Sequence, residues 1–338
     1  MRALLMERFG GPLTVREVPD PTPAPDGVVV AVGASGVCRS DWHAWSGHDS
    51  DVVLPHVPGH ELAGTVAAVG DRVRRWSVGD RVTVPFVCAC GLCPPCREGQ
   101  HQVCLRQTQP GFTHWGSFAE LVALDAADVN LVALPDDLSF ATAASLGCRF
   151  ATAFRAVTGV GRVAPGEWVA VIGCGGVGLS AVQVAVAAGA RVVAVDPSPG
   201  ARALASAMGA EHVLADPAAV LELTGGGVHV GLDCLGSPDT CVASIRALRP
   251  RGRHVQVGLL PPELGRPEVP MELVVARELA VLGSHGMAAH DYPAMLSLIA
   301  AGRLRPADLV TRELTLEEAG AALVDVGRAP GLAVVTSF

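Results

Sequence analysis

Two different hydrophobic patterns divide the chain. In the first half, short β-branched runs alternate with Gly, Pro and Asp, as in GVVVAVGA, GTVAAVG, GDRVTVPF and AELVALD. Short apolar runs bounded by turn-forming residues are typical of strands. The first half therefore predicts an irregular, mostly antiparallel β domain.

From Trp168 onward, apolar runs alternate with Ala-rich stretches of helical character. Strands separated by helical crossovers predict a parallel, doubly wound sheet, so the fold class is α/β. The predicted strands of this sheet span residues 168–172, 191–195, 212–214, 228–233, 253–258 and 279–284.

After Gly286 the pattern predicts a helix over about 290–302, a strand, a helix over about 316–327 and a final strand. We expect these last elements to return to the β domain. The predicted domains are therefore a β-rich domain of residues 1–152 and 287–338 and a parallel-sheet domain of residues 153–286.

The composition describes a folded protein. Half of the 338 residues are hydrophobic and 17% are charged, which favours a well-buried core over disorder. The net charge is −8, and no Lys/Arg block occurs anywhere in the chain. We therefore expect no nucleic-acid partner and no attachment to an anionic membrane.

Two features bear on where the protein resides. Glu7 and Arg8 interrupt the N-terminus where a signal peptide needs its apolar run, which predicts a cytoplasmic protein. The uncharged run 169–190 is long enough for a membrane span, but glycines break it near its start. We expect a buried strand and helix there, and no membrane span.

A glycine-rich turn follows the first strand of the parallel sheet. Glycines with the spacing Gly173-x-Gly175-x-x-Gly178 permit a tight turn, close approach of a pyrophosphate and helix–strand packing. Asp196 ends the next strand at the offset expected for a residue that binds the ribose hydroxyls, which favours NAD over NADP. The alternative is an ordinary turn with a solvated Asp. Arg202, shortly after Asp196, leaves NADP as a second possible cofactor. The predicted cofactor-binding residues here are Gly173, Gly175, Gly176, Val177, Gly178 and Asp196.

Four cysteines with short spacings mark a lobe in the β domain. The sequence Cys90-x-x-Cys93-x-x-Cys96-x7-Cys104 lies in a Gly/Pro-rich loop and can wrap one tetrahedral Zn²⁺. Four thiolates leave no open position for chemistry, so this zinc is predicted to be structural. Disulfides and an iron–sulfur cluster are the alternatives, and the nearby Cys88 is a fifth candidate thiol.

Three further segments carry metal-ligand residues outside the lobe. They are GVCRSDWH with Cys38, PGHELAG with His60 and Glu61, and SLGCRFATAF with Cys148. Two Cys and one His supply the three protein ligands of a catalytic zinc and leave its fourth position open. Each residue alone is more often a core or surface residue than a ligand. Their combination predicts a catalytic zinc site.

The sequence resembles the zinc-containing alcohol dehydrogenases of the medium-chain dehydrogenase/reductase superfamily over essentially the whole chain. This resemblance implies a GroES-like β-rich catalytic domain, a Rossmann domain for NAD(H), and one catalytic and one structural zinc per chain. The motif that carries the resemblance, beside the four-cysteine lobe, consists of Gly59, His60, Glu61, Gly64, Gly70 and Val73.

The resemblance also implies roles for individual residues of the metal site. Cys38, His60 and Cys148 would bind the catalytic zinc. Glu61 would be the acidic residue behind the metal and an occasional ligand during exchange. Asp41 would hold the ring of His60 in one tautomer.

Residues near Cys38 match further positions of the family. Arg39 matches the residue that clamps the cofactor pyrophosphate. Ser40 and His43 match a proton relay that leads from the reacting oxygen, through the ribose, to solvent.

An apolar substrate pocket is expected. Phe86 matches a substrate-lining aromatic of the family, and the scarce tryptophans Trp42, Trp45 and Trp115 are further candidates. Ordinary core packing is the alternative for each of these residues.

The predicted function is reversible hydride transfer between a primary or secondary alcohol and NAD. The alternatives are a polyol or amino-alcohol dehydrogenase of the same superfamily, a zinc-free quinone or enoyl reductase, and a non-catalytic NAD-binding module. The partner is a small-molecule alcohol, aldehyde or ketone. We also expect a homodimer or homotetramer, with the strand 279–284 as a candidate for pairing between subunits.

Overall fold

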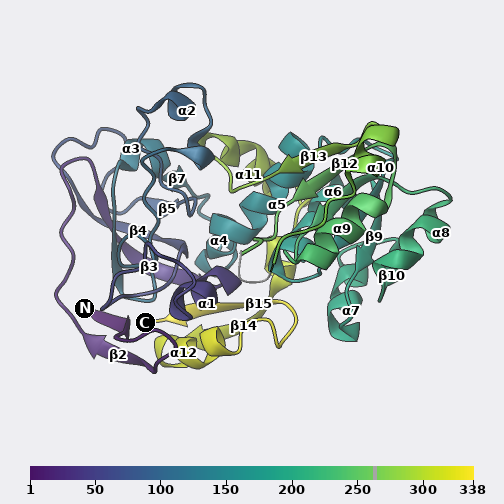
Figure 1. Ribbon diagram of the computed structural model, residues 1–338. Helices are drawn as coiled ribbons and strands as arrows, with labels where there is room; N and C mark the ends of the chain where they lie inside the picture. Colours follow the sequence, from purple (N-terminus) through teal and green to yellow (C-terminus); the bar gives the residue numbers. More distant parts are fainter. Residues whose placement is uncertain (262–264) are drawn as a thin grey trace. The chain divides into compact units, whose positions relative to one another are not determined.

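The computed structural model describes residues 1–261 and 265–338, which form two compact units. The first unit comprises Met1–Ala151, Gly286–Leu296 and Pro306–Phe338. The second unit comprises Thr152–His285 and Ser297–Arg305. The predicted α/β class is confirmed, because the first unit is β-rich and the second contains a parallel sheet. Figure 1 traces the elements of both units.

A mostly antiparallel sheet forms the centre of the first unit. Its strand order is β14-β15-β3-β4-β5-β7, and β6 pairs with β3 outside this order. The long strand β3 pairs antiparallel with β4, β6 and β15, and β1 and β2 form a separate hairpin. The bounds are β1 Arg2–Met6, β2 Leu13–Glu17, β3 Val28–Val37, β4 Glu61–Val69, β5 Arg81–Thr83, β6 Leu121–Leu124, β7 Val132–Ala133, β14 Val310–Thr315 and β15 Leu332–Ser337.

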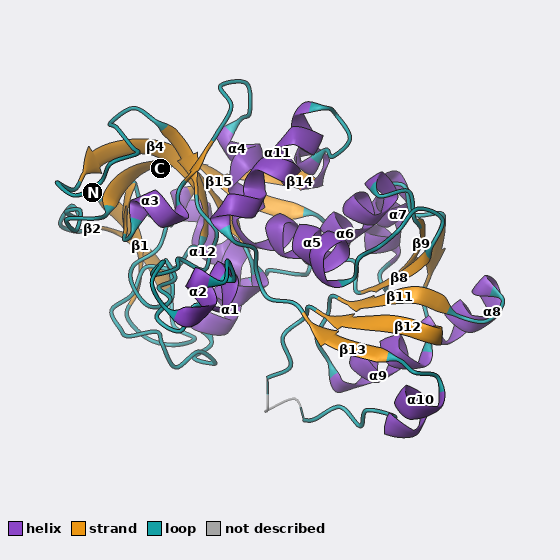
Figure 2. Cartoon of the chain, turned by 90° about the horizontal axis from the view of Figure 1, so that it is seen from above, coloured by secondary structure: helices purple, strands orange, loops and turns teal. Residues whose placement is uncertain are grey.

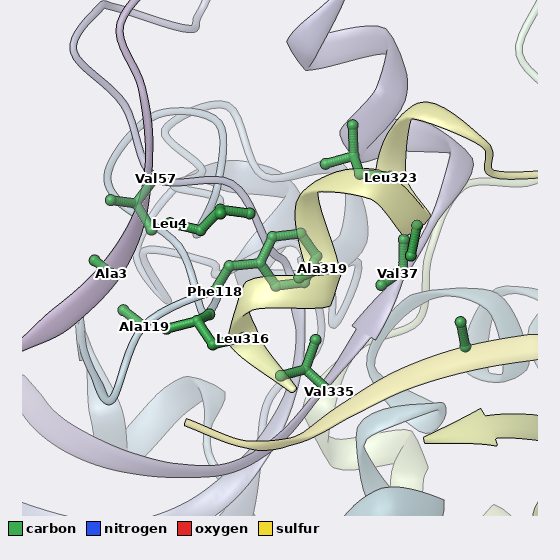
Figure 3. Close-up of a cluster of buried hydrophobic side chains, with 12 residues drawn as sticks. Ala3, Leu4, Val37, Val57, Phe118, Ala119, Leu316, Ala319, Leu323 and Val335 are labelled. Carbon is green, nitrogen blue, oxygen red and sulfur yellow. The ribbon is translucent and has the colours of Figure 1, made fainter. Parts of the chain in front are cut away.

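The C-terminal helix α12 (Leu316–Val324) closes one hydrophobic core of this unit (Figure 3). A capping box starts the helix, since Thr315 and Glu318 each bond to the other's backbone N–H. Leu316, Ala319 and Leu323 recur at helical spacing and are fully buried. They pack in one cluster with residues from the N-terminal strands and the middle of the chain, so the C-terminal segment is part of the first unit.

The second unit contains a six-stranded sheet of order β10-β9-β8-β11-β12-β13. All neighbouring strands are parallel, as the sequence predicts. The chain extends from β8 in one direction to β9 and β10, and then in the other direction from β11 to β13. The bounds are β8 Trp168–Ile172, β9 Arg191–Val195, β10 His212–Leu214, β11 Val228–Asp233, β12 Leu248–Gln256 and β13 Ala280–Gly283.

The helices of the second unit cover both faces of this sheet. Right-handed crossovers that run in opposite directions from the middle of a sheet place their helices on opposite faces. Figure 2 shows this arrangement for α6 (Gly176–Ala187), which follows β8, and α9 (Pro238–Arg246), which follows β11. Further helices of this unit are α7 Pro199–Ala207, α8 Val220–Thr224, α10 Met271–Ala276 and most of α5 Ala151–Arg155.

One segment lies elsewhere than predicted. The prediction assigns all of 287–338 to the β-rich domain, whereas Ser297–Arg305, which begins within helix α11 (Tyr292–Ala300), lies in the second unit. The side-chain amide of Gln183 on α6 explains this placement. It donates to the carbonyl of Arg305 at 2.9 Å and accepts from the Arg305 N–H at 3.0 Å.

The apolar run that follows Trp168 is a strand and a helix, as predicted, and most of its side chains are buried. No helix in the described ranges 1–261 and 265–338 has the length and apolar character that crossing a membrane requires.

Candidate metal centres and cofactor-binding turn

Four buried side chains of the first unit converge at one point. Their ligand atoms, from Cys38, His60, Glu61 and Cys148, all lie within 4.8 Å of one another. Cys38 is the N-cap of α1 (Arg39–Trp45), and Glu61, which follows His60, begins β4. Cys148 lies within a π-helical turn, Leu146–Phe150. The structure thus brings together the four residues that the sequence proposes for one metal site.

Asp41 connects two of these residues through its buried carboxylate. It accepts from the Cys38 backbone N–H at 3.0 Å and from the Gly59 N–H at 3.1 Å. It also lies 2.7 Å from His60 Nδ1, which is the contact expected from the resemblance. A carboxylate only accepts, so His60 Nδ1 carries a hydrogen, and in the neutral ring Nε2 then keeps its lone pair.

His60 Nε2 tests whether the site fits a metal. The nitrogen is buried and has no hydrogen-bond partner among the residues that the structure describes. A buried, unpaired acceptor costs free energy unless another ligand satisfies it. Two thiols lie within reach of the same nitrogen, and two Cys with one His form a known donor set for zinc. The residues therefore fit a zinc ion.

The two thiols of the cluster differ in their protonation. A hydrogen bond with Cys148, together with nearby His60 and Arg149, lowers the pKa of Cys38 well below its ordinary value despite burial. The hydrogen bond with Cys38 raises the pKa of Cys148, and burial raises it further. Of the two thiols, Cys38 is therefore the one that loses its proton more readily.

A π-helical turn positions Cys148. Such turns are rare and occur frequently at functional sites. The buried hydroxyl of Tyr292 donates to the carbonyls of Leu146 and Gly147 at 3.1 and 3.3 Å. Tyr292 belongs to the segment that returns to the first unit after residue 285, so this segment supports the ligand-bearing turn.

Arg149, which no sequence pattern singles out, binds Glu61 behind the cluster. The Arg149 backbone N–H and Nε each donate to Glu61 Oε1 at 2.9 Å, and Nη2 pairs with Oε2. Burial raises the pKa of Glu61, and the charge of Arg149 opposes that shift. A side chain at Gly36 would meet both partners, because its Cβ would lie 2.3 Å from Glu61 Oε2.

The predicted relay residues lie on or beside α1. Ser40 Oγ is 3.9 Å from Cys38 Sγ, and His43 follows Ser40 by three residues, on the same face of the helix. A further histidine that was not predicted, His48, has its Nδ1 3.1 Å from His43 Nδ1. The guanidinium of Arg39 lies 5.6 Å from the ring centre of Trp42.

The aromatic residues proposed for the substrate pocket separate into two groups. Phe86 lies edge-on to His60 with ring centres 6.2 Å apart, and Phe112, which the sequence analysis did not select, lies at 5.3 Å. Trp42 and Trp115 pack against the hydrophobic core of Figure 3. The Trp115 indole also donates to the Pro55 carbonyl at 3.0 Å.

The second cysteine group forms the predicted lobe. Cys90, Cys93, Cys96 and Cys104 also have ligand atoms within 4.8 Å of one another. Backbone N–H groups point at the sulfurs, including Cys90 N–H to Cys104 Sγ at 3.3 Å. The Sγ atoms of Cys93 and Cys96 are 3.3 Å apart, beyond the ~2.05 Å of a disulfide. A short helix, α2 (Pro94–Arg97), carries Cys96.

The fifth thiol, Cys88, lies outside this group. It is buried and its sulfur faces the Pro85 carbonyl at 3.7 Å. Burial raises the pKa of Cys88 to about 12. Its sulfur is not among the four ligand atoms that converge in the lobe, and the residue packs in a hydrophobic core cluster, so Cys88 is a core residue.

Cys93→Ser is expected to remove one zinc per chain and to expose the 90–104 lobe to proteases, because the lobe has little apolar core besides its cysteines. Limited trypsin digestion and elemental analysis check this. Cys88→Ser is the matched control and should keep both zinc ions. Loss of zinc in Cys88→Ser but not in Cys93→Ser would contradict the assignment.

The glycine turn of the second unit has the geometry of a phosphate-binding turn. Gly173 has φ +87°, and a Cβ on Gly178 would lie 1.8 Å from the Gly173 carbonyl oxygen. A Cβ on Gly175, by contrast, would meet no atom within 4 Å. Helix α6 starts with Gly175 as N-cap, so free N–H groups face the open space beside Gly175.

Asp196 lies beside this turn at the end of β9. Its carboxylate accepts from the Cys174 and Ser198 N–H groups, both at 2.8 Å. Arg202 donates to the carbonyls of Asp196 and Pro197 at 2.7 and 2.8 Å. The strand, the turn and the acidic residue are therefore joined as the sequence predicts.

Comparisons with known proteins match both halves of the chain. The alcohol dehydrogenase GroES-like domain matches residues 24–136, and the zinc-binding dehydrogenase family matches residues 176–301. An alcohol dehydrogenase from Geobacillus stearothermophilus is 37% identical over 312 residues, which are 90% of each chain. One from Rhizobium meliloti (strain 1021) is 39% identical over 291 residues, 84% of each chain.

This chain belongs to the zinc-binding alcohol dehydrogenases. The alcohol dehydrogenase TADH from Thermus sp. ATN1 has the same fold as this family member, with a TM-score of 0.90 at 32% identity over 100% of both chains. The family predicted from the sequence is confirmed, and the protein is an oxidoreductase with zinc as a cofactor. Both cysteine-containing ligand groups are complete, which argues against a zinc-free reductase.

Proposed function

We propose that this alcohol dehydrogenase transfers a hydride reversibly between a primary or secondary alcohol and NAD, at a zinc ion held by Cys38, His60 and Cys148. The observation that carries the proposal is the unpartnered Nε2 of buried His60. Two thiols surround this nitrogen, and Asp41 fixes the tautomer that leaves its lone pair free.

Zinc held by this donor set supplies Lewis acidity, which lowers the pKa of an alcohol hydroxyl. Asp41 keeps the proton on His60 Nδ1 and so holds the ring in its ligating orientation. Ser40 would accept the proton from the substrate hydroxyl while it gives up its own hydroxyl hydrogen, which would pass through the cofactor ribose to His43 and on towards solvent. Hydride acceptance belongs to the nicotinamide, which the protein binds and orients.

Glu61 is paired with Arg149. Its carboxylate lies within 4.8 Å of the other ligand atoms, so its charge is placed beside the proposed zinc. Phe86 and Phe112 make the surroundings of His60 apolar. An apolar site strengthens each electrostatic interaction in it.

A second zinc, bound by Cys90, Cys93, Cys96 and Cys104, is proposed as structural, since four thiolates complete a tetrahedral site. NAD is proposed to bind at the glycine turn through Gly173, Gly175, Gly176, Val177 and Gly178, with Asp196 at the ribose. Arg39 is proposed to bind the pyrophosphate. An NAD-dependent alcohol dehydrogenase of solved structure, 32% identical over 100% of both chains, supports the choice of NAD.

Replacing Asp196 with alanine is expected to lower kcat/KM for NAD by about 10- to 100-fold, because hydrogen bonds to a charged group contribute about 1.5–3 kcal/mol. The ratio of kcat/KM for NADP to kcat/KM for NAD should rise, since the variant lacks the carboxylate that repels the 2′-phosphate of NADP. Steady-state kinetics with both cofactors measure the ratio. Glu222→Ala, an exposed acidic residue of the same unit, should leave it unchanged, and an unchanged ratio in Asp196→Ala would contradict the role.

The protein is further proposed to be a cytoplasmic homodimer or homotetramer. Strand β13 is at the edge of its sheet, and its Val281 is 44% exposed. An exposed strand edge with apolar residues favours pairing with a second copy.

A substrate panel tests the proposed function. The zinc-loaded enzyme is incubated with NAD and with ethanol, 2-propanol, benzyl alcohol, sorbitol or threonine, and NADH formation is followed by absorbance. We expect turnover with simple primary or secondary alcohols. A strong preference for sorbitol or threonine would favour the polyol or amino-alcohol alternative, and the absence of turnover with every member would overturn the proposal.

A further inference from the structure

A second histidine lies at the end of α1, beside the proposed relay residue His43. The Nδ1 atoms of His43 and His48 are 3.1 Å apart. Two lone pairs at this distance would repel, so one nitrogen carries a hydrogen that points at the other. The two imidazoles therefore share one hydrogen bond.

The backbone sets this pairing independently of the side chains. The His48 N–H donates to the His43 carbonyl at 3.0 Å, and the Gly47 N–H donates to the Ala44 carbonyl at 3.1 Å. Gly47 has φ +80°, in the left-handed region. These features define a Schellman motif, which places the residue after the glycine against the residue five positions earlier. In most such motifs this contact is apolar, whereas here it joins two histidines.

The surroundings of the two histidines favour proton movement from His43 to His48. His43 is half-buried and His48 is exposed, while Trp42 packs edge-on to both rings, with ring centres 5.1 and 5.6 Å away. Burial lowers the pKa of His43, and the charges of Arg39 and His48 lower it further, against an opposing effect of Cys38. A proton is therefore held less firmly on His43 than on an ordinary histidine.

We propose that His48 is the last protein group on the path of the proton from the substrate hydroxyl to solvent, a step that rests on the proposed function. A proton arrives at His43 Nε2, and the hydrogen on His43 Nδ1 passes to His48 Nδ1. His48 then releases its Nε2 hydrogen to water or buffer. Each ring gains one proton and loses one, and proton exchange with water then returns both rings to their starting tautomers.

The test measures proton release directly. Zinc-loaded wild type and His48→Gln are mixed with NAD and benzyl alcohol in weak buffer, and a pH-indicator dye reports the released proton. We expect release to slow about 100-fold in His48→Gln, the lower end of the range that a positioned proton acceptor contributes. Added imidazole should restore the rate. His43→Gln combined with His48→Gln should be no slower than His43→Gln alone, since both act in one path.

His290→Gln is the matched control, because His290 is also an exposed member of a histidine pair, with His101 at a ring-centre distance of 4.8 Å. It should release protons at the wild-type rate. Three results would overturn this inference alone. They are proton release at the wild-type rate in His48→Gln, failure of imidazole to restore the rate of His48→Gln, and equal slowing of proton release in His290→Gln. Wild type that forms no NADH would overturn the proposed function, and this inference with it.

Discussion

Replacing His60 with alanine is expected to lower kcat/KM for alcohol oxidation by about 10³-fold or more, equal to about 4 kcal/mol of transition-state stabilisation. His60 Nε2 is buried without a hydrogen-bond partner among the described residues, and His60 belongs to the ligand group. Without this nitrogen, the ligand group consists of two thiols and the Glu61 carboxylate, which is paired with Arg149. Steady-state kinetics with NAD and benzyl alcohol, together with zinc content, measure the effect.

His56→Asn serves as the matched control. His56 is also a buried histidine with an unpartnered Nε2, but it belongs to no ligand group among the described residues. Its replacement should leave the zinc content unchanged and reduce kcat/KM far less. If His60→Ala kept both its zinc and its turnover, the catalytic site would have to lie elsewhere.

Arg149→Met is expected to destabilise the first unit by about 3–5 kcal/mol, because it leaves the charge of Glu61 buried without a partner. The side chains of the pair are 7% and 0% exposed. Methionine retains much of the volume of the arginine stem, so the loss of charge is the main change. Urea unfolding of the metal-loaded protein measures the free-energy difference.

The double variant Arg149→Met with Glu61→Gln separates charge from packing. Removing both charges should recover a large part of the lost stability, because a buried ion pair contributes little beyond the desolvation that it offsets. Thermal midpoints of the two variants and the wild type provide a second measurement. If Arg149→Met were as stable as wild type, the pair would not be the buried ion pair that its geometry indicates.

The sequence predicted the parts of the site that depend on residue type and spacing. The alternation of strands and helices predicted the six parallel strands, and the cysteine spacing predicted the lobe that Cys90, Cys93, Cys96 and Cys104 form. The resemblance predicted that Asp41 holds His60, a contact that joins residues 19 positions apart. These features follow from local patterns or from a motif.

Arg149 and Phe112 were missed for a physical reason, whereas His48 could have been found from the sequence. An arginine beside a cysteine has no pattern that marks it as buried, and its burial depends on Glu61, 88 residues away in the sequence. Phe112 reaches His60 only through the folded loops. The position of His48 was locally determined, since a glycine that ends a helix signals a Schellman motif, and this signal was available at Gly47. The placement of Ser297–Arg305 depends on Gln183, a contact over 122 positions.

Zinc stoichiometry tests most directly whether Cys38, His60 and Cys148 hold a catalytic metal. Elemental analysis of wild type, Cys38→Ser and Cys93→Ser is compared with NAD-dependent turnover of benzyl alcohol by each protein. We predict two zinc ions per chain in wild type and one in each variant, with turnover lost in Cys38→Ser. A Cys38→Ser variant that keeps two zinc ions and wild-type turnover would contradict the proposed site.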